Sequence, residues 1–137
     1  IRPDNDKMEN MVIRMREYLS HSLEPKNITI DFIADEHIMN ESLHMEQRRD
    51  LLLIFKEAIN NIAKYSQCMH TQIKLDRQNG FLRMMIKDDG IGFDMNRART
   101  SNGIRNMQRR AGLMDGEITI DSGPGKGTRI ELLVPVT

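Results

Sequence analysis

The chain has 137 residues, enough for one domain with a sizeable hydrophobic core and too few for two ordinary domains. Its 20 basic and 20 acidic residues cancel to a formal net charge of zero, which argues against a general nucleic-acid binder and a polybasic membrane binder. No apolar run approaches the roughly 20 residues of a membrane span, and the single cysteine, Cys68, excludes an intrachain disulfide and a zinc site built from cysteines.

The first half of the chain is expected to form a helix, a strand and a second helix. After Asp6, which has the spacing of a helix cap, apolar residues recur at helical intervals until Pro25 ends the pattern. Residues 28–32 alternate between apolar and polar side chains, as a half-buried strand does. Beyond a polar connection, a helix is expected from about Met45 to Tyr65, a stretch without glycine or proline.

The second half is expected to consist mostly of strands. Alternation over residues 71–75 and the turn pair Asn79-Gly80 indicate a hairpin, and the nearly all-apolar stretch 81–86 predicts a strand buried on both faces. Beyond it we expect a polar loop, a short helix and two strands, at residues 89–102, 103–114, 118–120 and 129–134. These elements predict one α+β domain with helices packed on one face of a largely antiparallel sheet.

Three polar residues share one face of the second expected helix. Glu57, Asn61 and Lys64 are spaced i, i+4 and i+7, and apolar residues occupy the opposite side. A carboxylate, an amide and an amine in line can supply a proton acceptor, a metal ligand and a phosphate partner. The same spacing also fits a solvated helix face that carries no chemistry.

Two glycine-containing segments adjoin expected strands. Asp88 and Asp89 end a strand and precede Gly90 and Gly92, so a ligand could approach the backbone while a carboxylate accepts a hydrogen bond from an amino group such as that of adenine. A second glycine-rich turn, residues 123–128, could cradle a ligand before the last strand. Either segment alone also fits a plain turn, because Asp and Gly are common turn residues.

A basic stretch lies between these segments. Five arginines and no acid fall within residues 97–110, where a polar loop leads into a helix start at Asn102-Gly103. Free backbone N–H groups at a helix start favour anions. A basic solvated helix is the alternative, and direct nucleic-acid binding is disfavoured because the stretch has no aromatic residue to stack on a base.

In this order the four segments resemble the ATP-binding catalytic domain of two-component sensor histidine kinases, within the GHKL ATPase superfamily. The family's N box and three glycine boxes correspond to residues 57–65, 88–92, 103–107 and 125–128. Arg110 and Ala111 follow as they do in the subgroup that feeds LuxR/NarL-type response regulators. The resemblance covers nearly the whole chain. It implies a Bergerat-type α/β sandwich of about five strands and three helices, in which residues 93–102 form a lid over ATP.

The resemblance implies how the phosphate end of ATP would be held. Asn61 would ligate the Mg²⁺ that bridges the phosphates, with Asn60 as a neighbouring contact, and Glu57 would lie near the γ-phosphate as a polar or general-base contact. Lys64 would approach the phosphates, so Glu57 and Lys64 are the expected catalytic residues. The family usually has a histidine after that lysine. Tyr65 stands here instead and could contact phosphate or ribose through its hydroxyl.

The resemblance also implies how the adenine end would be held. Asp88 would accept the adenine amino group, and Thr128 would assist through water. Gly90 and Gly92 would let adenine and ribose approach, and Gly103 would close the lid over the triphosphate. The residues expected to contact ATP are therefore Asn60, Asn61, Lys64, Tyr65, Asp88, Gly90, Gly92, Gly103, Ile104, Arg105, Gly127 and Thr128.

The implied activity is transfer of the γ-phosphoryl group of Mg-ATP to a histidine on a separate dimerisation domain, and from there to an aspartate of a response regulator receiver domain. Residues 1–6 resemble the linker that follows that phosphoacceptor domain, and the four histidines of the chain lie outside the phosphoacceptor motif. We therefore expect a cytoplasmic piece of a dimeric sensor, membrane-anchored or not, that binds no nucleic acid directly and cannot phosphorylate itself. The alternatives are a GHKL ATPase or anti-sigma-type serine kinase of another branch, and a module that binds nucleotide without chemistry.

Overall fold

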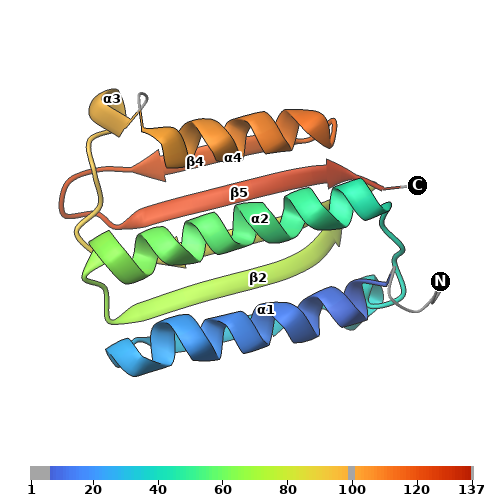
Figure 1. Cartoon of the computed structure of the whole chain (residues 1–137), viewed down its shortest axis with the longest axis horizontal. Coiled ribbons are helices and arrows are strands. Elements are labelled where there is room, and N and C mark those ends of the chain that lie inside the picture. Colours follow the sequence, from blue (N-terminus) through green and yellow to red (C-terminus); the bar gives the residue numbers. More distant parts are fainter. Residues whose placement is uncertain (1–6, 99–100, 137) are drawn as a thin grey trace.

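The architecture is a five-stranded sheet with helices on one face (Figure 1). The computed structural model describes residues 7–98 and 101–136. The strands are β1 Thr29–Ala34, β2 His70–Gln78, β3 Phe81–Asp88, β4 Glu117–Ser122 and β5 Thr128–Pro135. They pair in the order β1-β2-β3-β5-β4, with β1 parallel to β2 and the other neighbours antiparallel.

Three helices cover the sheet: α1 Met8–Leu23, α2 Met45–Asn61 and α4 Asn102–Leu113. They lie side by side on the same face, with α2 between α1 and α4 (Figure 1). The short helix α3, Met95–Ala98, and 3-10 turns at Glu24–Lys26 and Glu36–Ile38 lie in the connections. The expected class, an α+β sandwich of five strands and three main helices, is therefore confirmed.

The end of α2 differs from the expectation. The helical stretch runs from Met45 to Ser66, close to the expected bounds, but regular α-helical bonding stops at Asn61 and a π-helix continues over Ile62–Ser66. The buried Ser66 hydroxyl closes this turn, because it donates to the carbonyl four residues earlier at 2.9 Å and accepts the N–H of Cys68 at 3.1 Å. π-Helical turns are rare in proteins overall, and those that do occur are often found at functional sites.

The core lies between the helices and the sheet, and it is built from alternate strand residues and one stripe of each helix. Phe55 of α2 is fully buried within it. The largest fully buried side chains are Phe55, Met8, Met15, Leu23, Ile38, Leu51, Ile54, Ile59, Ile73, Leu75, Leu82 and Met84. This packing fixes the direction of the polar face of α2 relative to the ends of β3 and β5.

The opposite face of the sheet carries charged side chains instead of a second core. The expectation that residues 81–86 are buried on both faces is met on the outward side by Met85, which is buried, but not by Phe81, which is 37% exposed. Arg83 on the same side binds Asp76 of β2 with an Nη2–Oδ2 distance of 2.9 Å and Glu131 of β5 with an Nη1–Oε2 distance of 3.0 Å. Carboxylates on both neighbouring strands therefore satisfy the charge in the middle of this apolar run.

Arg83 should make the stability of the fold sensitive to acid. Its hydrogen bond lowers the pKa of Asp76 below the ordinary value, and its hydrogen bond to Glu131 lowers the pKa of that carboxyl as well. Such carboxylates stabilise the folded state above their unfolded pKa, about 4, and this contribution is lost as the pH falls through the folded pKa. Arg83→Met should therefore reduce the free energy of unfolding more at pH 7 than at pH 3.

Urea unfolding of the parent and the variant at the two pH values measures this difference. Lys87→Met is the matched control, because it removes an exposed cation from the same face of the same strand. We expect this control to change the free energy of unfolding little at either pH. A loss of the same size at both pH values for Arg83→Met would contradict the assigned ion pairs.

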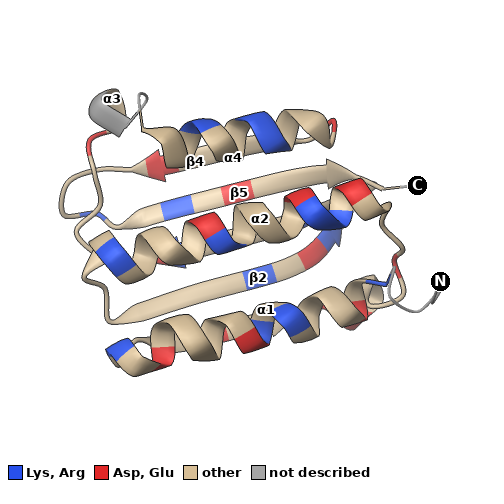
Figure 2. Ribbon diagram, viewed as in Figure 1, with Lys and Arg blue, Asp and Glu red and all other residues tan. Residues whose placement is uncertain are grey.

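Charge is distributed unevenly over the helices. Figure 2 shows acidic and basic residues interspersed on α1 and α2, whereas the charged residues of α4 are all basic. The zero net charge thus conceals a positive helix beside α2. None of the helices in the described part of the chain combines the length and the hydrophobicity of a membrane span.

Candidate functional site

A cavity of about 620 Å³ opens between the C-terminal half of α2, the start of α4 and the ends of β3 and β5. Its size falls in the range of small-molecule sites. Its walls come from four separate stretches of the chain, within residues 57–66, 86–93, 101–107 and 120–130. Segments that are far apart in the sequence therefore meet around one space.

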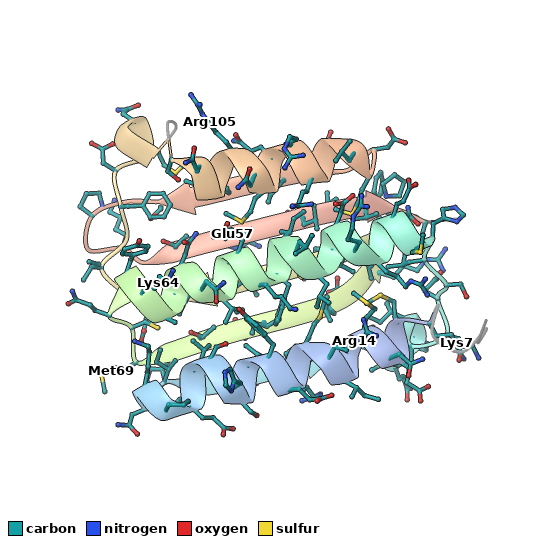
Figure 3. The ribbon with its side chains drawn as sticks, viewed as in Figure 1. Lys7, Arg14, Glu57, Lys64, Met69 and Arg105 are labelled. Carbon is teal, nitrogen blue, oxygen red and sulfur yellow. The ribbon has the colours of Figure 1, made fainter. Side chains whose placement is uncertain are left out.

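Helix α2 presents a polar face to this cavity. Glu57, Asn61 and Lys64 all line it, although Lys64 lies in the π-helical turn. Figure 3 shows Glu57 between α2 and α4, and Lys64 further toward the C-terminal end of α2. A methyl group at Gly103, in the first turn of α4, would lie 3.3 Å from Oε2 of Glu57 and 3.5 Å from Nδ2 of Asn61. The start of α4 therefore closes over the polar face of α2.

The first turn of α4 also brings backbone N–H groups to the cavity. Ser101 caps the helix, and its Oγ accepts the N–H of Ile104 at 3.3 Å. The first N–H groups of a helix have no partner within it, and both Asn102 and Gly103 line the cavity. The positive end of this 12-residue helix and the ammonium group of Lys64 suit this end of the cavity to an anion.

The other end of the cavity combines apolar walls with one buried carboxylate. Asp88 is 5% exposed at the end of β3, and its Oδ1 accepts the N–H of Gly90 at 2.8 Å. Burial raises the pKa of the Asp88 carboxyl above its ordinary value, and the nearby charge of Asp89 adds to this effect, while backbone hydrogen bonds from Gly90 and Thr128 oppose it. The apolar residues of the cavity include Ile86, Ile91, Phe93, Ile120 and Ile130. A flat ring with an amino group would suit this end, because its faces would be buried and its N–H would bind Asp88.

Beside the Asp88 carboxylate, the loop after β3 and the turn before β5 pass so close to each other that no side chain fits between them. Gly92 has a φ of 65°, and a Cβ there would lie 2.1 Å from the carbonyl oxygen of Gly123. The N–H of Ile91 donates to the carbonyl of Ser66 at 2.7 Å, and its own carbonyl accepts the N–H of Gly125 at 2.6 Å. These contacts hold the loop after β3 between the π-helical turn and the turn before β5, which positions the carboxylate.

Gly92→Ala should therefore destabilise the fold. A left-handed backbone costs an alanine on the order of 1–2 kcal/mol, and the clash with a backbone oxygen adds to this cost. Gly112→Ala is the matched control, because Gly112 of α4 has nothing within 4 Å of an added Cβ, and alanine there should stabilise the helix by up to about 1 kcal/mol. Thermal unfolding checks both variants, and a Gly92→Ala protein as stable as the parent would contradict the loop contacts.

The cavity wall includes most of the residues that the sequence singled out, namely Glu57, Asn61, Lys64, Tyr65, Asp88, Gly92, Gly103, Ile104 and Thr128. Four expected residues lie outside the wall. Asn60 accepts a hydrogen bond from the Tyr18 hydroxyl at 2.6 Å and lines a separate hollow. Arg105 is exposed and extends from α4 away from α2 (Figure 3). Gly90 and Gly127 instead pack against backbone carbonyl groups of neighbouring segments.

The expected lid, residues 93–102, is described at both ends. Phe93, Ser101 and Asn102 line the cavity, and α3 lies between them. Lid residues 99–100 lie outside the described residues, as does the expected linker at residues 1–6. The described part of the lid thus adds an aromatic wall to the apolar end of the cavity and a helix start to its polar end.

Two acidic residues support the cavity in ways that sequence reasoning missed. Asp50 of α2 is 2% exposed and binds Arg110 of α4 with an Nη1–Oδ1 distance of 3.0 Å, which ties the two helices together. Asp89 accepts the N–H groups of His70 and Met69 at 3.0 and 2.9 Å, and these bonds, that of His70 first, lower the pKa of its carboxyl. Asp50 follows two arginines and precedes the apolar run 51–55, so it read as an ordinary polar residue and nothing in the sequence indicated the first role. For the role of Asp89, the only signal in the sequence was that it directly follows another aspartate.

Comparison with known proteins agrees with this arrangement. The sequence model of the family described as "Histidine kinase-, DNA gyrase B-, and HSP90-like ATPase" matches residues 46–137. An uncharacterized sensor-like histidine kinase of Chloroflexus aurantiacus is 29% identical over 99% of this chain and 24% of its own length. The signal transduction histidine-protein kinase/phosphatase DegS of Bacillus subtilis is 31% identical over 93% of this chain and 34% of its own length. The chain thus spans between a quarter and about a third of these relatives.

Solved structures share the fold. The histidine kinase domain of the blue-light activated histidine kinase of Erythrobacter litoralis EL346 matches with a TM-score of 0.80 and 17% identity, over 99% of this chain and 65% of that chain. The mycobacterial sensor histidine kinase MprB matches with a TM-score of 0.73 and 15% identity, over 95% of both chains. At these low sequence identities the similarity shows a shared fold, that is, the same arrangement of the sheet and the helices.

Proposed function

Because the chain belongs to the histidine kinase-, DNA gyrase B- and HSP90-like ATPase family, we propose that it binds Mg-ATP in the cavity and donates the γ-phosphoryl group to a histidine on a separate acceptor domain. The observation that carries this proposal is one space of about 620 Å³ with buried Asp88 at an apolar end and Glu57, Asn61 and Lys64 at a polar end. An adenine ring with its amino group and a triphosphate have the complementary chemistry.

At the apolar end, Asp88 selects the base. Its ionised carboxylate accepts a hydrogen from the adenine amino group, and the Thr128 hydroxyl assists through a bridging water. Guanine presents a carbonyl oxygen at the same position, which would face the carboxylate without a hydrogen to share. The buried position of Asp88 supports this role, because a hydrogen bond to a charged group away from water is among the stronger ones.

At the polar end, the side chains of α2 hold the triphosphate. Lys64 and the N–H groups at the start of α4 offset its charge, and Glu57 lies beside the γ-phosphate as the polar or general-base contact. Phosphoryl transfer depends mainly on positioning and on stabilising charge, so groups fixed on a packed helix suit it. The close approach of Gly103 to Glu57 and Asn61 supports a lid that closes here over the phosphates.

The groups on α2 fit a magnesium ion. The amide oxygen of Asn61 is a hard ligand of the kind that Mg²⁺ accepts, and this ion commonly takes one or two protein oxygens together with phosphate oxygens. Among the described residues, no three His, Cys, Asp or Glu side chains gather into a cage of their own, which agrees with an ion held largely by the nucleotide. When bound, Mg²⁺ would neutralise the phosphate oxygens during transfer.

The histidine kinases among the relatives favour a protein histidine over water as the acceptor. The proposal therefore includes a dimeric acceptor domain and, downstream, a response regulator of the LuxR/NarL-linked class whose aspartate takes the phosphate. It places this chain in the cytoplasm, where ATP and the regulator are available.

The test is to incubate the chain with γ-labelled Mg-ATP and a separately produced dimeric domain that carries an acceptor histidine. We expect label on that histidine, with the acid lability of a phosphoramidate. Rapid release of labelled phosphate without labelled protein would instead identify a hydrolase of the same family. Nucleotide binding with neither product would identify a binding module.

A further inference from the structure

A second hollow, of about 230 Å³, lies on the helical side of the molecule between α2 and α4. We call this space the α2–α4 hollow. It is lined by Tyr18, Leu53, Lys56, Glu57, Asn60, Asn106, Met107 and Arg110. Glu57 and Met107 line both this hollow and the larger cavity. Since Glu57 also lies at the polar end of that cavity (Figure 3), the hollow adjoins the place proposed for the γ-phosphate.

Side-chain contacts hold one wall of the hollow in place. The Tyr18 hydroxyl donates to Oδ1 of Asn60 at 2.6 Å, which leaves the amide nitrogen of Asn60 as a donor. The Tyr18 ring packs edge-on against Phe55 with centroids 6.4 Å apart, and Nζ of Lys56 lies 5.2 Å from the Tyr18 ring centroid. A wall fixed in this way by α1 and α2 needs little reorganisation when a group binds.

The charges around the hollow nearly cancel. Arg110 is paired with buried Asp50 at 3.0 Å, and Lys56 is next to Glu57 in the chain, with the opposite charge. The hollow therefore suits a neutral group better than a second phosphate. Its volume lies below the roughly 300–1,000 Å³ of pockets for whole small ligands, so it suits a single side chain.

Hydrogen-bonding groups in the hollow are available to such a side chain. In the part of the chain that the structure describes, neither the Glu57 carboxylate nor the Asn106 amide has a hydrogen bond or ion pair. A neutral imidazole has one N–H donor and one nitrogen acceptor. A carboxylate and two amides around a small, neutral space match that ring.

We propose that the α2–α4 hollow receives the imidazole of the acceptor histidine, an inference that rests on the proposed function. The ring donates its N–H to Glu57. Its unprotonated nitrogen forms a bond to the γ-phosphorus as the bond between that phosphorus and the β,γ-bridging oxygen breaks. The electron pair of the broken bond leaves with ADP, and the N–H proton stays on the ring. The product is a phosphoimidazolium whose positive charge the Glu57 carboxylate stabilises.

Blocking the hollow tests this inference. Asn106→Phe places a ring in it from an exposed position of α4, and Gln108→Phe places the same ring at an exposed position of the same helix outside the hollow. For Asn106→Phe we expect kcat/KM for the acceptor domain to fall by about tenfold or more, with unchanged affinity for a non-hydrolysable ATP analogue and an unchanged unfolding temperature. Gln108→Phe should match the parent in all three. Undiminished transfer by Asn106→Phe, or equal loss of transfer and of analogue binding, would overturn the proposal.

A second readout separates this proposal from the proposed function. In the chain loaded with Mg²⁺ and the analogue, 4-methylimidazole should shift the side-chain amide NMR signals of Asn60 and Asn106 in a saturable way, and Asn106→Phe should abolish the shift for Asn60. If the parent transfers no label but this titration behaves as expected, the hollow is an imidazole site and the kinase assignment fails. If the parent transfers no label and neither amide shifts, the hollow assignment fails too.

Discussion

Asn61→Ala is expected to reduce phosphoryl transfer from Mg-ATP to the acceptor histidine by about a hundredfold or more. The amide of Asn61 is the proposed protein ligand of the magnesium ion, and its loss removes the contact that fixes the ion and the phosphates relative to α2. Alanine has the highest helix propensity, so the fold should survive the change. Initial rates of label transfer, measured over a range of magnesium concentrations, check the expectation.

Asn40→Ala is the control for this variant, because Asn40 is exposed in a turn and lines none of the hollows around the site. It should transfer label at the parent rate. If Asn61→Ala also keeps the parent rate and the parent magnesium dependence, the assignment of Asn61 as a magnesium ligand is wrong. An Asn61→Ala protein that no longer unfolds cooperatively would point to a structural role instead.

Asp88→Asn is expected to weaken binding of ATP analogues by about 1.5–3 kcal/mol, or roughly tenfold to more than a hundredfold in Kd. The amide keeps one oxygen for the N–H of Gly90, but its nitrogen cannot accept the adenine amino group. Because burial raises the folded-state pKa of this carboxyl, ionisation above that pKa costs the folded state stability, and the cost disappears as the pH falls below the unfolded pKa. The neutral amide should therefore leave the protein at least as stable at pH 7. Calorimetric titration and thermal unfolding measure the two quantities.

Asp89→Asn provides the matched contrast one residue further along. Backbone N–H groups of His70 and Met69 lower the pKa of the Asp89 carboxyl, so its ionised form stabilises the fold above the unfolded pKa. Neutralising it should reduce stability at pH 7 while leaving nucleotide affinity nearly unchanged. If both variants lose affinity equally, the adenine contact cannot be attributed to Asp88.

The candidate site could be predicted wherever its geometry is local. Glu57, Asn61 and Lys64 point to one side because the helical repeat fixes their relative directions, and all three line the cavity. Asp88 and Gly92 were recognisable because glycines that follow a carboxylate at a strand end let the backbone there approach another group closely. The class of the fold followed from the order and patterning of the same elements.

Contacts between distant parts of the chain could not be predicted in the same way. The hydrogen bond that turns Asn60 toward Tyr18 joins residues 42 positions apart, and the ion pair of Asp50 with Arg110 joins residues 60 positions apart. The outward face of β3 was misjudged for the same reason, because the partners of Arg83 lie on two other strands. Periodicity reports which side of an element is apolar, but not which charges will meet there.

The central claim is that the cavity binds Mg-ATP, and calorimetric titration with a non-hydrolysable ATP analogue tests it most directly. We expect one site per chain, binding that weakens when magnesium is chelated, and no comparable binding of the corresponding GTP analogue. The absence of detectable binding at millimolar ATP analogue with magnesium present would contradict the claim.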